Sequence, residues 1–248
     1  MNTIDSASPG RRERSWQPRV LDATAGALDH VVTQLRGLAH AVAPLWQEDL
    51  PSSDDLAAYR PLIHDLLAAE SDLVAGAGVA IGPGRLTDQD RHLEWWFTRA
   101  TGGAEALRVN LDPAAPDFYD FTAEEWFLAT QERLEPVATG PLVDYACTID
   151  YALTLTHPVF TGGEFVAVAA ADIPLERLEP RLMPMLAEDG RRLVLANDSD
   201  RVVLSTTAAH RPGERLPKEL RGRGVPLRRI PWGGWRLIDV TEEDATGR

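Results

Sequence analysis

The sequence predicts an α+β fold in which a long N-terminal helix packs on a central antiparallel sheet. Apolar residues recur at helical spacing over residues 20–46, which is typical of one long amphipathic helix. After Gly76 the pattern changes to short segments with β character, separated by glycine and proline. No internal repeat and no flexible internal linker is visible in the sequence, so we assign these elements to one domain.

Composition and charge place limits on the class of protein. Residues 1–14 have the composition of a disordered tail, residues 15–240 form the predicted domain, and residues 241–248 form a second tail. A hydrophobic fraction of 44% is enough for a packed core. The formal net charge of −13 disfavours nucleic acids and anionic membranes as partners, because a protein bound to either supplies Lys and Arg.

The ends of the chain and its single cysteine bear on its location. Cys147 has no second cysteine with which to form an intrachain disulfide, so nothing in the sequence indicates an oxidising compartment. The N-terminal segment is polar and basic without an apolar stretch after it, which is not the pattern of a secretory signal. The sequence also has no run of about 18 apolar residues. We therefore expect a cytoplasmic protein.

Two helices are expected at the start of the domain. The first covers residues 20–46 and ends before Pro51. Ser52 or Ser53 can then cap a second helix, predicted over residues 56–67.

Strands and a third helix follow. Residues 77–81, 92–99 and 106–111 are predicted to be strands of the antiparallel sheet. Thr122 and Glu125 have the spacing of a capping box, which predicts a helix that begins there and ends near Pro136.

The second half of the chain predicts two hairpins and a fourth helix. Residues 151–160 and 164–172 form a predicted hairpin around Gly162 and Gly163. Pro174 fits the first turn of a helix over residues 175–186. The remaining predicted strands are a hairpin, 192–196 with 201–205, and a last strand, 235–240.

Several features follow one another along the chain: the helix with Trp126, the Pro158-Val159 strand, the Gly162-Gly163 turn, the strand ending Ala170-Ala171-Asp172-Ile173, the LVLANDSDRVVLST hairpin and Gly213-x-x-Leu216. In this order, the residues resemble a Cache domain, the extracytoplasmic PAS-like sensor module that is also called PDC. The resemblance covers residues 20–240 and implies a PAS/PDC-like sheet that binds a small metabolite without transforming it. Such domains are mostly the receptor ends of chemoreceptors and kinases.

Similarity to the amino-acid-binding members of that family implies roles for four residues. Tyr119 would be the early aromatic residue, Trp126 the tryptophan, Tyr145 the later tyrosine and Asp172 the acid that holds an amine. An alternative for Asp172 stays open, because an acid just before Pro174 is also a suitable N-cap of the next helix.

One position departs from the family's pattern. Glu124 stands where the family has an arginine, and a guanidinium is the group that binds a carboxylate with two hydrogen bonds. Arg99 or Arg108, on neighbouring predicted strands, could replace it. Without a guanidinium, the remaining carboxylate and aromatic rings suit an ammonium group. We therefore expect the ligand to be an amine, a quaternary ammonium compound or an amino acid.

Position along the predicted strands and loops completes the site. Trp95 and Trp96 are adjacent in one strand, so they point to opposite faces of the sheet, and we assign Trp96 to the site. The predicted ligand-binding residues are Trp96, Tyr119, Trp126, Asp144, Tyr145, Asp150, Thr154 and Asp172.

No catalytic residue, cofactor or metal is predicted, since the six histidines are scattered and no paired acids stand out. An alternative is a small α+β hydrolase or isomerase that uses an aspartate and His157 in the same cleft. A further alternative is a structural partner that dimerises through the long helix. For a sensor, we expect signalling to a separate partner protein, with a homodimer through the N-terminal helix.

Overall fold

The structure, a computed structural model, describes residues 16–99, 101–143, 151–188, 190–227 and 234–241. It divides into two compact units. The larger covers residues 29–180, and the smaller combines residues up to 28 with those from 181 onward. The division falls within two helices, α2 (Trp16–Val42) and α5 (Leu175–Leu186). The single domain over residues 15–240, with a tail at each end, stays a prediction.

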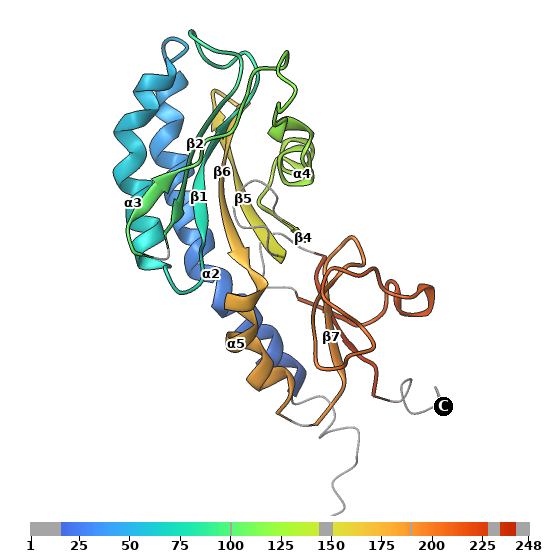
Figure 1. The fold of residues 1–248 in the computed structure, drawn as a ribbon. Helices are drawn as coiled ribbons and strands as arrows, with labels where there is room; N and C mark the ends of the chain where they lie inside the picture. The colour runs from blue at the N-terminus through green and yellow to red at the C-terminus, as the bar shows by residue number, and fades with distance from the viewer. Residues whose placement is uncertain (1–15, 100, 144–150, 189, 228–233, 242–248) are drawn as a thin grey trace, which may run out of the picture. The chain divides into compact units, whose positions relative to one another are not determined.

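The larger unit is built on a six-stranded antiparallel sheet with the strand order β3-β2-β1-β6-β5-β4 (Figure 1). The longest hairpin joins β5 to β6 through Gly162 and Gly163, whose φ angles of 54° and 86° suit glycine. This hairpin confirms the predicted one. The strands are β1 (Gly76–Ile81), β2 (His92–Thr98), β3 (Ala104–Ala106), β4 (Val137–Val143), β5 (Tyr151–Thr161) and β6 (Glu164–Pro174).

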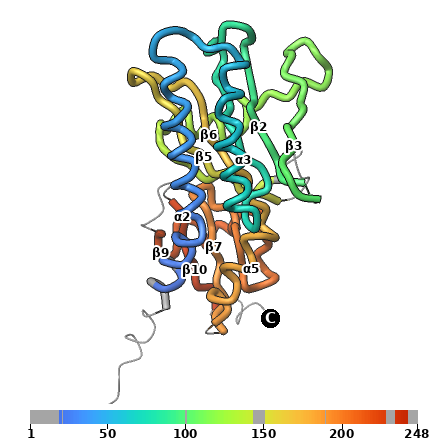
Figure 2. The backbone as a smooth tube through the Cα atoms, turned by 90° about the vertical axis from the view of Figure 1, so that its left-hand side faces the viewer, coloured from blue at the N-terminus to red at the C-terminus, as the bar shows by residue number. Residues whose placement is uncertain are grey.

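Helices cover both faces of this sheet (Figures 1 and 2). The part of α2 from residue 29 onward and α3 (Arg60–Ala69) lie on one face, and α4 (Glu125–Arg133) lies on the other. The apolar stripe of α2 is buried, which explains the helical spacing in the sequence. Two short 3-10 helices, η1 (Ala43–Trp46) and η2 (Ser53–Tyr59), connect α2 to α3. The fold class is α+β with the long helix on an antiparallel sheet, as predicted.

Three local predictions for this unit were wrong. The expected strand over residues 106–111 ends at Ala106, after which the chain leaves the sheet. The predicted capping box does not form, because the Thr122 hydroxyl bonds to Asp120, and α4 begins only at Glu125. Strand β4 was missed, since its Gly140-Pro141 pair is typical of a loop; at this edge of the sheet a register shift accommodates the proline.

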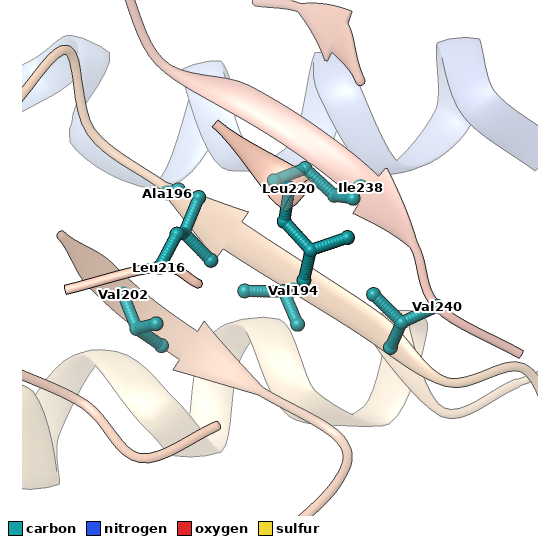
Figure 3. Packing of buried hydrophobic residues seen from close by; sticks show 7 residues of the cluster. All are labelled: Val194, Ala196, Val202, Leu216, Leu220, Ile238 and Val240. Carbon is teal, nitrogen blue, oxygen red and sulfur yellow. The ribbon is translucent and has the colours of Figure 1, made fainter. Parts of the chain in front are cut away.

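The smaller unit contains a four-stranded antiparallel sheet with the order β8-β7-β10-β9. Its turn between β7 and β8 is closed by Asn197, whose side-chain oxygen accepts hydrogen bonds from the backbone N–H groups of Ser199 and Arg201. The strands are β7 (Leu193–Ala196), β8 (Val202–Ser205), β9 (Val225–Pro226) and β10 (Arg236–Asp239), with a 3-10 helix, η4 (Lys218–Leu220). Figure 3 shows its core: Val194, Ala196, Val202, Leu216, Leu220, Ile238 and Val240.

In the part of the chain that the structure describes, no helix combines the length and the apolar character that a membrane span requires.

Candidate functional site

The face of the large sheet that α4 covers brings together two of the predicted residues, Thr154 and Asp172. Asp172 in β6 pairs with Thr154 in β5 on one side and with Gly76 in β1 on the other. Directly paired residues of neighbouring strands point to the same face of a sheet. The Thr154 hydroxyl donates a hydrogen bond of 2.8 Å to Oδ1 of Asp172.

Asp172 is a buried acid within a strand. Its exposed fraction is 7%, and it lies two residues before the end of β6. Because α5 begins at Leu175, the residue directly before that helix is Pro174, so Asp172 is not the N-cap. A carboxylate is costly to bury unless hydrogen bonds or opposite charges compensate. Helix capping therefore does not explain why an acid is buried at this position.

Gly76 and Trp95 complete this part of the face, and neither was among the predicted residues. A Cβ atom at position 76 would lie 3.0 Å from Nε1 of Trp95 and 3.5 Å from Oδ2 of Asp172. Trp95 is only 5% exposed, and its Nε1 atom has no hydrogen-bond partner among the described residues. The indole N–H group and the carboxylate therefore border the same space, which glycine leaves without a side chain.

Aromatic side chains from α4 and the segment before it pack beside Trp95. The rings of Trp95 and Trp126 have centroids 6.2 Å apart, and Phe121 stacks nearly parallel to Trp126 with centroids 6.3 Å apart. Phe127 lies 5.8 Å from Trp126, and Tyr119 packs against the same cluster. The structure thus places Tyr119 and Trp126 on the Asp172 side of the sheet. Trp126 also contributes to the core, because neighbouring rings cover much of it.

A hydrogen-bond network fixes α4 over this face. The hydroxyl groups of Thr130 in α4 and Thr156 in β5 lie 2.6 Å apart. The Thr156 hydroxyl also bonds to the backbone of Val137 in β4. These buried contacts position the helix and, with it, Trp126.

Trp96, one of the predicted residues, lies on the opposite face of the sheet from Asp172. Its Nε1 donates a 2.6 Å hydrogen bond to Glu94, and its ring meets His64 of α3 edge to face at 4.4 Å. The guanidinium of Arg60 lies 5.7 Å from the centre of the Trp96 ring. The sheet therefore separates Trp96 from Asp172, and its neighbour Trp95 lies on the site's face because side chains alternate along a strand.

Glu94 is the charged centre of that opposite face. Burial alone would raise its pKa, but the His92 ring nitrogen 3.6 Å away and the hydrogen bonds from Arg60 and Trp96 outweigh burial and lower the pKa to about 2. Arg60 makes two of these bonds, of 2.9 and 3.2 Å. The Glu94 carboxylate therefore stays ionised and ties α3 to β2.

His157 also lies on the opposite face from Asp172. It pairs with Ala169 in β6, one position out of phase with the residues that face Asp172. Its ring lies 6.2 Å from His40 of α2, and burial, partly offset by a hydrogen bond to Pro158, lowers its pKa. Asp172 and His157 therefore do not form the aspartate–histidine pair of the enzyme alternative, and its other two candidate acids, Asp144 and Asp150, lie outside the described residues.

In the described part of the chain, none of the other candidate residues lies beside Asp172. Asp144, Tyr145 and Asp150 lie outside the described residues. Arg99 is exposed and paired with Glu105 at 2.6 Å, and Arg108 is exposed. Within the described ranges, no group of three or more His, Cys, Asp or Glu residues could hold a metal ion.

The two missed residues left a weak signal in the sequence. Gly76 and Gly78 alternate at the start of β1, which indicates that something approaches one face of that strand closely. At Gly78 the reason is backbone, because a Cβ would lie 2.3 Å from the Glu94 carbonyl oxygen. Only the register of the strands shows that the approach at Gly76 is by polar side-chain atoms.

Comparison with known proteins gives a clear result for the fold. No protein-family model matches the chain, and no curated protein matches it. Solved structures do match. One is titled methyl-accepting chemotaxis protein X, with a TM-score of 0.65, 14% identity and coverage of 92% of this chain and 95% of that one.

Two further structures are ligand-binding domains of Pseudomonas chemoreceptors. PctC of Pseudomonas aeruginosa PAO1, solved in complex with GABA, has a TM-score of 0.56, 19% identity and coverage of 90% of this chain and 94% of that one. CtaA of Pseudomonas fluorescens, in complex with L-valine, has a TM-score of 0.59, 16% identity and coverage of 90% and 91%. These are Cache/PDC-type sensor domains, so the predicted resemblance is confirmed at the level of the fold.

Proposed function

We propose that this chain is a non-catalytic, ligand-binding sensor domain for a small metabolite that carries a positively charged nitrogen. The ligand class comprises amines, quaternary ammonium compounds and amino acids. The observation that carries the proposal is the Asp172 carboxylate, buried within β6 beside Thr154, Gly76 and the Trp95 indole. The fold supports a sensor, since similar structures include ligand-binding domains of chemoreceptors.

The chemistry of these groups suits a cation. A buried carboxylate binds an ammonium group by charge-assisted hydrogen bonds, which are about twice as strong as neutral ones. An aromatic face adds about 2 kcal/mol when the cation is desolvated. Micromolar affinity requires about 8 kcal/mol, so a few contacts of this kind supply much of the total.

The ligands in the titles of similar structures support the same class. PctC was solved with GABA, PctB with L-Gln, and CtaA with L-valine, and each of these ligands carries an ammonium group. Glu124 in place of the expected arginine sets this chain apart, because a second carboxylate near α4 favours ligands with less negative charge. We therefore place amines alongside amino acids in the proposed ligand class.

Thermal denaturation with a ligand panel tests the proposal. Alkylamines, amino alcohols, betaines and the standard amino acids are added in turn, and a ligand at a hundredfold its dissociation constant adds about 2.7 kcal/mol to the stability. A rise in melting temperature with members of one class, confirmed by calorimetry, is the expected result. If no member of any class shifts the melting temperature at millimolar concentration, the proposed ligand class is wrong.

Replacement of the acid shows whether the binding occurs at the proposed site. Asp172→Asn keeps the shape of the side chain and removes its charge, so we expect the affinity of the panel's hit to fall at least about tenfold. Asp239→Asn is the matched control, because that acid is half-buried and pairs with Arg191 in the smaller unit. Equal losses of affinity in both variants would show that Asp172 does not bind the ligand.

The proposal also covers the signalling partner, the oligomeric state and the location of the sensor. We expect a separate signalling protein as the partner, a homodimer through the N-terminal helix, and a cytoplasmic location. Light scattering with and without the ligand tests the dimer, and a reporter fusion to the full-length protein tests the location.

A further inference from the structure

We propose that Trp95 determines specificity at this site: its indole N–H group donates a hydrogen bond to an oxygen atom of the ligand next to the nitrogen that Asp172 holds. This inference rests on the proposed function and narrows it. The ligand is then an ammonium compound with a nearby oxygen, as in an amino alcohol or an amino acid, and not an alkylamine without oxygen.

The first argument is the state of the indole N–H group. Trp95 is 5% exposed, and its Nε1 atom has no hydrogen-bond partner among the described residues. A buried N–H group normally has a partner, because it loses its bond to water on folding. Two other tryptophans follow this rule: Trp46 donates to the Arg85 carbonyl oxygen at 2.8 Å, and Trp96 donates to Glu94 at 2.6 Å.

The second argument is the position of this group. Nε1 of Trp95 and Oδ2 of Asp172 lie 3.0 and 3.5 Å from the point where a Cβ of residue 76 would be. A ligand that occupies the adjacent space meets a donor and an acceptor at the same time. The ammonium group binds the carboxylate, and an oxygen atom three bonds from the nitrogen accepts a hydrogen bond from the indole N–H.

The third argument is the choice of glycine at position 76. At Gly78, on the same face of β1, a side chain is excluded by backbone, because the Glu94 carbonyl oxygen would lie 2.3 Å from its Cβ. At Gly76 the two nearest atoms are polar side-chain atoms instead. A larger residue there would place its side chain against both groups, whereas glycine leaves the donor and the acceptor without a side chain between them.

The test uses three probes with one carbon skeleton: L-valinol, L-valine and 3-methylbutan-2-amine, which has a methyl group where valinol has CH2OH. Calorimetry gives the affinity of each for the wild type and for Trp95→Phe. In the wild type, we expect the two oxygen-bearing probes to bind about fivefold more tightly than the amine. In Trp95→Phe, which keeps a ring but removes the donor, this advantage should disappear.

Trp96→Phe is the matched control. It is the same substitution at the adjacent position, but on the other face of the sheet, so the ratio among the three probes should keep its wild-type value. The ratio is used because loss of ring volume at position 95 would weaken all three probes alike. The wild-type ratio needs no variant, so a Trp95→Phe protein that fails to fold does not leave the inference untested.

The outcomes separate the two proposals. If the amine binds the wild type as tightly as L-valinol and L-valine, or if Trp95→Phe weakens all three equally, the role of Trp95 is overturned while the sensor proposal stands. If none of the three binds, and no member of the wider panel does, the proposed function fails and the inference falls with it.

Discussion

The two faces of the six-stranded sheet each bury a carboxylate beside a tryptophan of β2, but they surround it differently. On the α3 face, Glu94 is 4% exposed and bonds to Arg60 and Trp96. On the α4 face, Asp172 is 7% exposed, accepts a bond from the Thr154 hydroxyl and borders the unbonded indole N–H of Trp95. The bond between Glu94 and the Arg60 guanidinium stabilises the fold. Asp172, beside an indole N–H without a partner among the described residues, is instead placed as a ligand-binding group would be.

The two faces also differ in how completely their polar groups are hydrogen-bonded by the protein. The Glu94 network links α3 to β2 and leaves the indole of Trp96 bonded. The Asp172 side has glycine at position 76, where a side chain would meet polar atoms. Sites that bind ligands often keep groups that are not fully satisfied by the protein itself. The following substitutions test whether the α3 face contributes mainly to stability and the α4 face mainly to ligand binding.

The largest expected effect comes from the two glycines of β1. Gly78→Ala should lower the free energy of unfolding by about 3 kcal/mol, because its Cβ would meet backbone atoms of Glu94 and Trp95 at 2.3 and 2.7 Å. Gly76→Ala should cost less, since its nearest contact is 3.0 Å, but it should abolish binding of the panel's hit. Urea denaturation and calorimetry measure the two effects. Similar losses of stability in Gly78→Ala and Gly76→Ala would contradict the distinction between the two glycines.

The next largest effect is expected at Glu94. Glu94→Gln should lower the free energy of unfolding by about 2 kcal/mol, because the bonds to the Arg60 guanidinium weaken. Asp172→Asn should change it by less than about 1 kcal/mol, since an amide oxygen can still accept the bond from Thr154. Ligand affinity should show the opposite order. A larger stability loss for Asp172→Asn than for Glu94→Gln would show that Asp172, and not Glu94, is the carboxylate that stabilises the fold.

A pH dependence should distinguish Glu94 in a third way. Its folded pKa of about 2 lies below the ordinary value of 4.5, so its stabilising contribution is complete above pH 4.5 and is lost as the pH falls toward 2. The stability difference between wild type and Glu94→Gln should therefore shrink between pH 6 and pH 3. Urea denaturation at several pH values measures it, and a difference that stays constant would contradict the pKa.

The smallest effect concerns the hydroxyl that supports Asp172. Thr154→Val removes the 2.8 Å bond and keeps the shape of the side chain, so ligand affinity should fall about threefold as the carboxylate loses its orientation. Thr154→Ser retains the hydroxyl and should keep most of the affinity. Calorimetry with the same ligand compares them, and a serine variant as weak as the valine variant would assign the effect to packing.

Much of the architecture could be predicted from local patterns. The helical spacing of α2, the Gly162-Gly163 turn between β5 and β6, and the helix over residues 175–186 all came from neighbouring residues. Predictions failed where two local contacts competed, or where a distant contact decided the outcome. Thr122 bonds to Asp120 rather than capping α4, and the edge strand β4 forms around a proline because β5 pairs with it.

The sequence by itself determined the order of the helices and strands and the presence of an acid, Asp172, at the end of an apolar strand. It also required Trp95 and Trp96 to point to opposite faces, because side chains alternate along any strand. Which of the two shares a face with Asp172 was decided only by the tertiary structure. The pairing of β2 with β1 and of β1 with β6 sets that choice, and a shift of one residue in either register would have exchanged the two tryptophans.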